Sequence, residues 1–219
     1  MSRFFKATFG ALASVKNMTT TTDASRLIEP VLNDLADVVA AIRPEQFTDP
    51  TPCTGFDVGQ LRAHVLGWVT FFAAAFDDPE GRTERPDPKQ QPVPEDPQAG
   101  AEVVRSAAAR IKAAVDGGVA ERPVVMMQST LPGSMMLRMT IWEYLAHGHD
   151  LAVATGQPWN PPSAAVEDAL EFGPTMLTDE YRGVDKDFGP IVPVPPDAPA
   201  MDRLLGFTGR DPHWRPSPT

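Results

Sequence analysis

Two residues that commonly bind metals or move protons, Glu143 and His147, are four positions apart in the segment Thr140–Asp150, whose pattern predicts a helix. This spacing places a carboxylate and an imidazole on one helical face, one turn apart. A second amphipathic segment, Leu61–Trp68, carries His64 within its apolar stripe. If the two helices are neighbours in a bundle, two imidazoles and one carboxylate meet and form a three-ligand metal site with open positions.

The case for a metal ion rests on the cost of burying Glu143. A carboxylate on the inner face of a helical bundle is destabilising unless a positive charge compensates it. A divalent cation held by His64 and His147 would supply that charge and would also occupy the imidazole lone pairs. In the alternative interpretation, both histidines are core residues that hydrogen-bond to nearby carbonyls or to Glu143. Glu143 would then need no cation, and it would need none at a solvated rim either.

Four further residues were weighed for a role at this site. Asp150 follows His147 by three residues and shares its face, so it either orients that imidazole as a hydrogen-bond acceptor or bonds to another helix. His149 points about 200° away from His147 and is predicted to lie on the surface or between helices. Cys53 is interpreted as a small, buried apolar residue rather than as a nucleophile or a metal ligand. His213 is assigned no role.

Composition restricts the kinds of partner. The 219-residue chain has a formal net charge of -10, which argues against a nucleic-acid partner because phosphate binding needs a basic face. Its one cysteine excludes an internal disulfide and fits a reducing compartment. The chain has no run of about 18 apolar residues, so we expect no membrane span. We therefore expect a cytoplasmic protein that binds neither nucleic acid nor membranes, as a monomer or a homodimer.

Hydrophobic periodicity predicts four long helices and several shorter elements. The second helix begins with a capping-box pattern, in which Thr54 is the cap and Asp57 the acid three residues later. The proline-rich residues 79–97 are predicted to form a crossover loop, and Asp96 to cap the third helix. Gly148, inside the fourth helix, permits a close approach or a slight kink. The expected elements are helices over 23–42, 54–77, 97–116, 134–155, 163–181 and 200–208, an extended piece over 124–128, a turn over 131–133 and a proline-rich arm over 191–199.

The first 17 residues form an N-terminal extension that contains three basic and no acidic residues. One interpretation is a transit-type or surface-seeking amphipathic segment. We favour an upstream false start or a disordered extension, with Met18 rather than Met1 as the initiator, because the apolar run is too short for a secretory signal. Residues 18–219 are then expected to form one domain with a C-terminal extension from about residue 160.

Two motifs and the tail carry a family resemblance. Residues 51–64, Thr-Pro-Cys-Thr-Gly-Phe-Asp-Val-Gly-Gln-Leu-Arg-Ala-His, resemble the start of the second helix in the mycothiol-dependent maleylpyruvate isomerase metal-binding family, a group within the DinB-like four-helix bundles. Residues 143–158, which begin Glu-Tyr-Leu-Ala-His, look like its second metal motif. The tail over residues 188–212 is similar to the ending of an uncharacterised actinobacterial branch of that family.

The resemblance implies an all-α, DinB-like four-helix bundle with a long crossover loop and a C-terminal proline-rich arm plus short helices. It implies that His64, Glu143 and His147 bind a divalent metal, most often zinc. It also implies that a small thiol, mycothiol in actinobacteria, coordinates the open position as a thiolate. The chain departs from the isomerase pattern in its short, proline-rich tail, which puts maleylpyruvate in doubt as its substrate. His149 stands where this branch commonly has tryptophan.

The leading hypothesis is a mycothiol-dependent metalloenzyme, an S-transferase or isomerase, in which the metal activates the thiol for attack on an electrophilic substrate. One alternative is a non-catalytic small-molecule-binding or stress-response bundle whose metal is structural or absent. A second alternative is a metal-dependent hydrolase, with water in the open position and Asp150 or Glu143 as the base.

Overall fold

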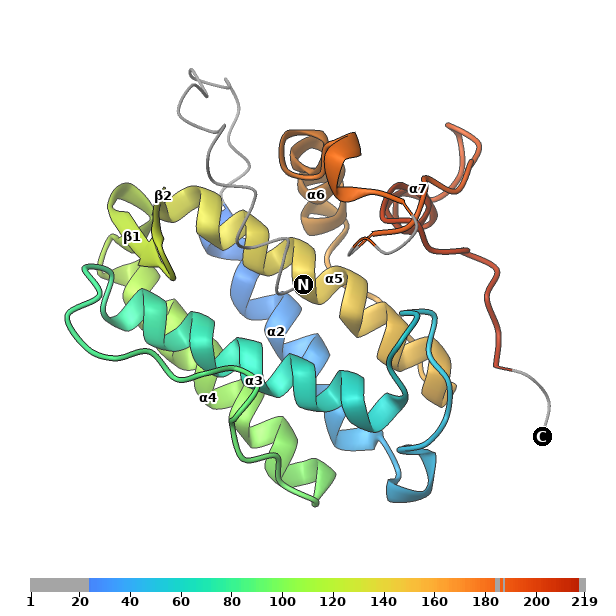
Figure 1. The fold of residues 1–219 in the computed structure, drawn as a ribbon, viewed down its shortest axis with the longest axis horizontal. Helices are drawn as coiled ribbons and strands as arrows, with labels where there is room; N and C mark the ends of the chain where they lie inside the picture. Colours follow the sequence, from blue (N-terminus) through green and yellow to red (C-terminus); the bar gives the residue numbers. More distant parts are fainter. Residues whose placement is uncertain (1–23, 184–185, 187, 217–219) are drawn as a thin grey trace.

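Four long helices form a bundle in this computed structural model, which describes residues 24–183, 186 and 188–216 (Figure 1). The bundle helices are α2 (Ala24–Ala41), α3 (Val58–Asp77), α4 (Pro97–Asp116) and α5 (Gly133–Thr155). Helix α2 packs against α4 and α5, and α3 packs against the same two helices. The predicted all-α four-helix bundle is therefore confirmed. The N-terminal extension, residues 1–17, lies outside the described residues.

The bundle core is made by the apolar stripes that the periodicity predicted. Helix α5 differs from the other three because it is buried on almost every side, with α2 and α3 against it and α6 also in contact. A helix surrounded in this way buries any polar residue it carries. The fully buried core side chains include Ile28, Leu32, Leu35, Leu61, Phe72, Phe76, Trp142 and Tyr144.

Helix α3 begins later than predicted. Asp57, not Thr54, is the N-cap: its side chain accepts a 2.7 Å hydrogen bond from the amide of Gln60, and the Gln60 side chain accepts from the amide of Asp57. This reciprocal pair is a capping box shifted by three residues from the expected one. Thr54 and Gly55 lie instead in the turn that leads into the helix.

Residues 79–96 contain no helix or strand and connect α3 to α4, as the predicted crossover requires. Arg85 fastens this loop, because its guanidinium donates to the carbonyls of Ala74, at 2.7 Å, and Val125, at 3.1 Å. The predicted cap of α4 is also confirmed, since the Asp96 carboxylate accepts from the amide of Gln98 at 3.0 Å. The loop is thus tied to both of its flanks.

The predicted extended piece after α4 belongs to a two-stranded antiparallel hairpin, β1 (Pro123–Met126) and β2 (Ser129–Pro132). The expected turn over residues 131–133 was wrong, because the chain turns at Met127 and Gln128. The Pro-Gly pair at 132–133 misled the prediction: it lies at the start of α5 instead. Met127 adopts a left-handed φ of 53°, which is uncommon for a residue other than glycine and which the sequence did not signal.

The C-terminal extension lies outside the bundle and carries α6 (Ser163–Met176) and α7 (Ala200–Phe207) (Figure 1). The helix predicted over 163–181 ends earlier, at Met176, and only a short 3-10 turn follows over Asp179–Tyr181. Pro174 accounts for the early end, because proline lacks an amide and its ring crowds the preceding turn. The proline-rich arm over 191–199 has no helix or strand, as expected.

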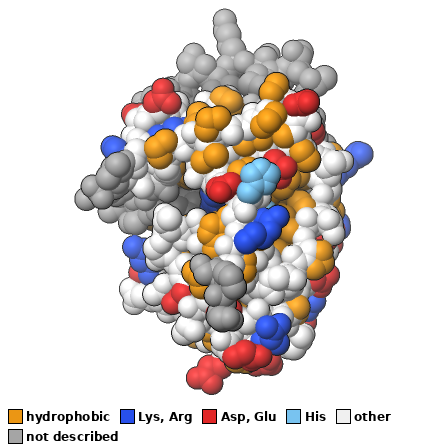
Figure 2. Space-filling view, turned by 90° about the vertical axis from the view of Figure 1, so that its right-hand side faces the viewer, with side chains coloured by type: hydrophobic (Ala, Val, Ile, Leu, Met, Phe, Trp, Pro, Cys, Tyr) orange, Lys and Arg blue, Asp and Glu red, His pale blue; other side chains and the backbone are white. Residues whose placement is uncertain are grey.

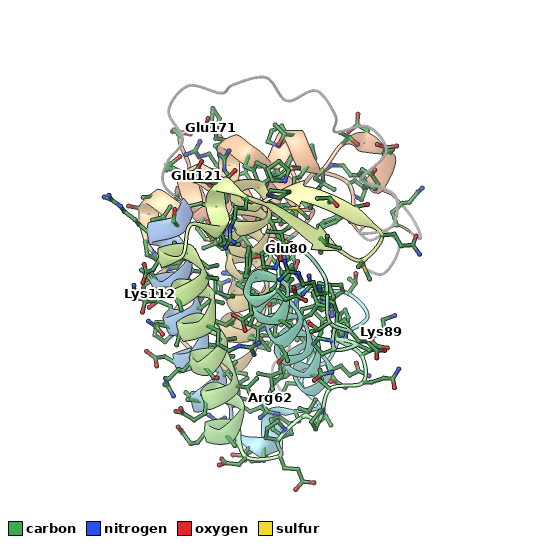
Figure 3. All side chains as sticks on the ribbon, turned by 90° about the vertical axis from the view of Figure 1, so that its left-hand side faces the viewer. Arg62, Glu80, Lys89, Lys112, Glu121 and Glu171 are labelled. Carbon is green, nitrogen blue, oxygen red and sulfur yellow. The ribbon has the colours of Figure 1, made fainter. Side chains whose placement is uncertain are left out.

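Charged side chains divide between the interior and the surface. Arg62 lies between α3 and α4 with 2% of its surface exposed, whereas Lys112 points outward from α4 (Figure 3). The face seen in Figure 2 shows hydrophobic side chains gathered above a histidine, with acidic and basic side chains around it. Of the helices over the described ranges, none has both the length and the apolar character needed to cross a bilayer.

Gly148 provides a test of the packing around α5. A Cβ at this position would overlap the indole ring of Trp159, which lies against the helix backbone. We predict that Gly148→Ala lowers the free energy of unfolding by about 1–3 kcal/mol through overpacking, measured by urea denaturation. Helix propensity alone would raise it by about 1 kcal/mol, so a stabilised variant would contradict the close approach. In a Trp159→Leu background, the cost of Gly148→Ala should shrink.

Candidate metal centre

The three side chains singled out in the sequence meet at one point. The Oε1 atom of Glu143 lies 3.2 Å from Nε2 of His64 and 3.3 Å from Nε2 of His147. The three candidate ligand atoms all lie within 4.8 Å of one another. Glu143 and His147 expose only 3% and 6% of their surface. Whether they bind a metal stays a prediction, but the structure brings the predicted ligand set together.

Helix geometry and aromatic packing place these side chains. Glu143 and His147 project from the same face of α5 because they are one turn apart. His64 comes from the facing helix α3, and its ring lies between Phe56 and Trp68, with centroid distances of 5.2 and 6.2 Å. These aromatic neighbours restrict the imidazole to the side of α3 that faces α5.

Burial and mutual attraction act in opposite directions on the three groups. Burial raises the pKa of Glu143, but the stronger combined effect of His147 and His64 holds that pKa well below its ordinary value. Burial lowers the pKa of His64, and its interactions with Glu143 do not reverse this shift. Burial also opposes a charge on His147, yet Glu143 and Asp150 raise its pKa well above the usual range. The carboxylate therefore remains ionised, and a bound cation would replace a proton on the imidazoles.

Asp150 contacts His147 from the side away from Glu143. Its Oδ2 atom lies 3.1 Å from Nδ1 of His147. Sequence analysis offered two roles for this carboxylate, orienting the imidazole or bonding to another helix. The structure shows the contact with the imidazole and a second contact with a residue beyond the last helix. Arg210, which follows α7, donates to Asp150 from Nε at 2.8 Å and from Nη2 at 2.8 Å. Burial raises the pKa of Asp150, but Arg210 and His147 outweigh it and lower that pKa to about 2.

Two residues of this region were missed or misjudged from the sequence. Arg210 is 60 positions from Asp150 and follows a helix-ending glycine, so no local pattern links them. Cys53 is half-buried rather than fully buried, and it lines a cavity together with His147. Cys53 nevertheless packs against the hydrophobic core, as an apolar residue would. That it is neither a nucleophile nor a ligand stays a prediction.

Cys53 also belongs to a second group of possible ligands, with His147 and Asp150, whose candidate atoms lie within 4.8 Å of one another. A cation there would sit beside the Arg210 guanidinium, which already forms a charge-assisted fork with Asp150. Two positive charges on one carboxylate repel, so this second group fits a metal poorly. The group of His64, Glu143 and His147 fits better, because it supplies two imidazole nitrogens and one uncommitted carboxylate, a donor set suited to zinc and similar ions.

The candidate ligands form the floor of a cavity of about 420 Å³. This volume is within the range of small-molecule sites. One wall comes from the loop before α3, and the opposite wall comes from the C-terminal extension. The lining residues that argue for a binding site are Cys53, Phe56, Trp142, Lys186, Phe188 and Arg210. The other two histidines are elsewhere: His149 joins neither ligand group among the described residues, and His213 is exposed.

The four-helix bundle is the fold that the resemblance implied, and it brings two histidines and a glutamate together from facing helices. The sequence model of the mycothiol maleylpyruvate isomerase N-terminal domain matches residues 28–152. This match covers more than half of the chain, which therefore belongs to the mycothiol maleylpyruvate isomerase N-terminal domain family.

Two further comparisons give similar proteins. An uncharacterized protein of Mycobacterium tuberculosis, found in strains CDC 1551 / Oshkosh and ATCC 25618 / H37Rv, is 29% identical over 179 residues. The alignment covers 80% of this chain and 91% of that protein. The crystal structure of the mycothiol-dependent maleylpyruvate isomerase superposes with a TM-score of 0.50 at 17% identity. It covers 66% of this chain, which spans 65% of the isomerase; a likeness at this identity shows the fold alone.

The Asp150–Arg210 pair offers a test of the buried charges. Asp150 is fully buried, so Asp150→Ala leaves the guanidinium of Arg210 without a counter-charge. We predict a loss of about 3–5 kcal/mol in the free energy of unfolding, measured by denaturant titration of the metal-free protein. The matched control Asp116→Ala, which removes the exposed partner of Lys112, should have little effect. Equal effects of the two variants would contradict the burial of this pair.

Proposed function

We propose that the protein is a metalloenzyme in which His64, Glu143 and His147 hold a divalent cation, most simply zinc. In this proposal, a low-molecular-weight thiol would occupy the cavity and its sulfur would add to an electrophilic carbon of the substrate. Isomerisation would follow if the same C–S bond later broke and released the thiol, and S-transfer if another group left that carbon and the thiol proton went to solvent. One observation carries the proposal: three ligand atoms of the right types converge on the floor of a cavity large enough for a small molecule. The cofactor and the substrate are separate molecules, and both must fit this cavity.

The residues of the chain have separable tasks in this proposal. When bound, the metal supplies a Lewis acid that lowers the pKa of a coordinated thiol. Asp150 accepts a hydrogen bond from the Nδ1–H group of His147, so the proton that a bound cation would replace is the one on Nε2, which faces Glu143. Phe56, Trp142 and Phe188 line the cavity with apolar surface, which limits the access of water to a reactive thiolate.

Family membership favours mycothiol as the thiol, because the family and the similar crystal structure are both named for a mycothiol-dependent isomerase. We do not extend the proposal to maleylpyruvate. The chain spans 65% of that isomerase, and its C-terminal extension supplies a wall of the cavity where the substrate would lie. We place the reaction in the cytoplasm, where a thiol co-substrate stays reduced.

A hydrolase that uses Asp150 as its base is less consistent with the geometry. Asp150 is fully buried, it does not line the cavity, and Arg210 holds both of its oxygens. A non-catalytic binding protein remains the principal alternative, and the two measurements that follow separate it from the proposed enzyme.

Metal uptake is the first measurement. We predict that metal-free protein takes up about one zinc ion per chain, detected by elemental analysis after gel filtration. His64→Ala and His147→Ala should lose this uptake, because each removes one of the three ligands. His149→Ala and His213→Ala, which remove histidines outside the ligand set, should retain it. Wild-type protein that holds no stoichiometric metal after reconstitution would refute the proposal.

Thiol binding is the second measurement. Isothermal titration calorimetry with mycothiol should detect binding to the zinc-loaded protein and much weaker binding to the metal-free protein, because the metal stabilises the thiolate form. The methylated thioether of mycothiol, which cannot ionise, serves as the control ligand. Equal affinity of the loaded and metal-free proteins for mycothiol would favour a non-catalytic binding module.

A further inference from the structure

We propose that Arg210 is a positioning residue of the metal centre, so that metal binding and docking of the C-terminal segment 200–210 stabilise each other. This inference rests on the ligation by His64, Glu143 and His147 proposed above. It adds a residue from outside the family match, which ends at residue 152. The C-terminal extension thereby becomes part of the metal site as well as a wall of the cavity.

A shared carboxylate oxygen links Arg210 to His147. The Oδ2 atom of Asp150 lies 3.1 Å from Nδ1 of His147 and 2.8 Å from Nη2 of Arg210. Nε of Arg210 donates to the other oxygen, Oδ1, at 2.8 Å. The planar guanidinium thus fixes the carboxylate plane by two parallel hydrogen bonds. Because that carboxylate orients the His147 ring, the direction of the His147 Nε2 lone pair depends on Arg210.

The end of α7 is built to deliver Arg210 to this point. The amide of Gly209 donates to the carbonyl of Gly206 at 3.1 Å, and the amide of Arg210 donates to that of Leu205 at 2.9 Å. These two bonds form a Schellman motif. Gly209 has a φ of +82°, and an added Cβ would lie about 3.0 Å from the backbone of Gly189. The turn that aims Arg210 therefore requires glycine for both conformation and space.

Apolar packing holds α7 in place independently of the ion pair. Leu204 and Leu205 are each 1% exposed, and α7 packs against α6. The amide of Val192, in the proline-rich arm, donates to the carbonyl of Gly206 at 2.9 Å. A substitution that shortens only the Arg210 guanidinium therefore leaves the helix with most of its contacts. The effect on the metal site can then be measured in a folded protein.

A positioning role and a purely structural ion pair predict different results. A structural pair stabilises the fold to the same extent with and without metal. A positioning residue changes metal affinity, and removal of such outer partners typically weakens it by about 10–100-fold. Thermodynamic reciprocity then requires that the metal strengthen the docking of segment 200–210 by the same factor.

The first experiment compares zinc affinities by competition with a chromophoric chelator. We expect Arg210→Met to bind zinc about 10–100-fold more weakly than wild type, and Arg210→Lys, which cannot form the fork, to fall between them. The matched control is Arg203→Met, within α7 itself, which loses only a partly exposed pair with Glu167 and should keep wild-type affinity. If wild type binds zinc and Arg210→Met binds it equally well, the positioning role is refuted and the metal site stands.

The second experiment needs no variant of Arg210. Hydrogen–deuterium exchange of wild-type protein should show slower exchange over residues 200–210 after zinc loading, and His147→Ala treated with zinc should show no such change. Unchanged exchange in zinc-loaded wild type would overturn the coupling even if Arg210→Met failed to fold. Wild type that binds no zinc at all would remove the proposed metal ligation, and the coupling with it.

Discussion

The architecture of this protein depends on how it compensates two carboxylates buried on one helix. Glu143 and Asp150 both lie inside α5, where an isolated charge is strongly destabilising. Imidazoles from α3 and α5 surround Glu143, whereas a guanidinium from the distant C-terminal extension neutralises Asp150. The two carboxylates meet at His147, which contacts both. The candidate site thus combines ligand atoms from the bundle with a counter-charge from the extension.

This dependence explains the distribution of rigid features around the site. The bundle fixes the ligand atoms through helix geometry, since α3 and α5 present them from facing surfaces. The loop before α3 and the extension then shape a cavity above the ligands. The bundle, apart from its outermost helix ends, and the loop before α3 lie within the matched family domain, whereas the extension lies outside it. The scaffold is thereby shared with the family, and part of the cavity wall comes from outside the matched domain.

The sequence predicted the periodic parts of this structure and the local motifs well. Helices α2 to α5 and the Asp96 cap followed from spacings within a few turns. The meeting of His64 with Glu143, 79 positions away, required in addition that the two helices be neighbours in a bundle. The failures have physical reasons. The hairpin turn uses a left-handed methionine where the sequence offered a more obvious Pro-Gly pair. The Arg210–Asp150 pair joins residues 60 positions apart, and periodicity carries no information about such contacts.

The ligand set itself is tested most directly by X-ray absorption spectroscopy of the zinc-loaded wild-type protein without added thiol. Ligation by His64, Glu143 and His147 predicts a first shell of nitrogen and oxygen at about 2.0–2.2 Å with multiple scattering from imidazole. A sulfur contribution at about 2.3 Å would contradict it. Such a signal would place the ion at Cys53 instead, in the group that the Arg210 guanidinium disfavours.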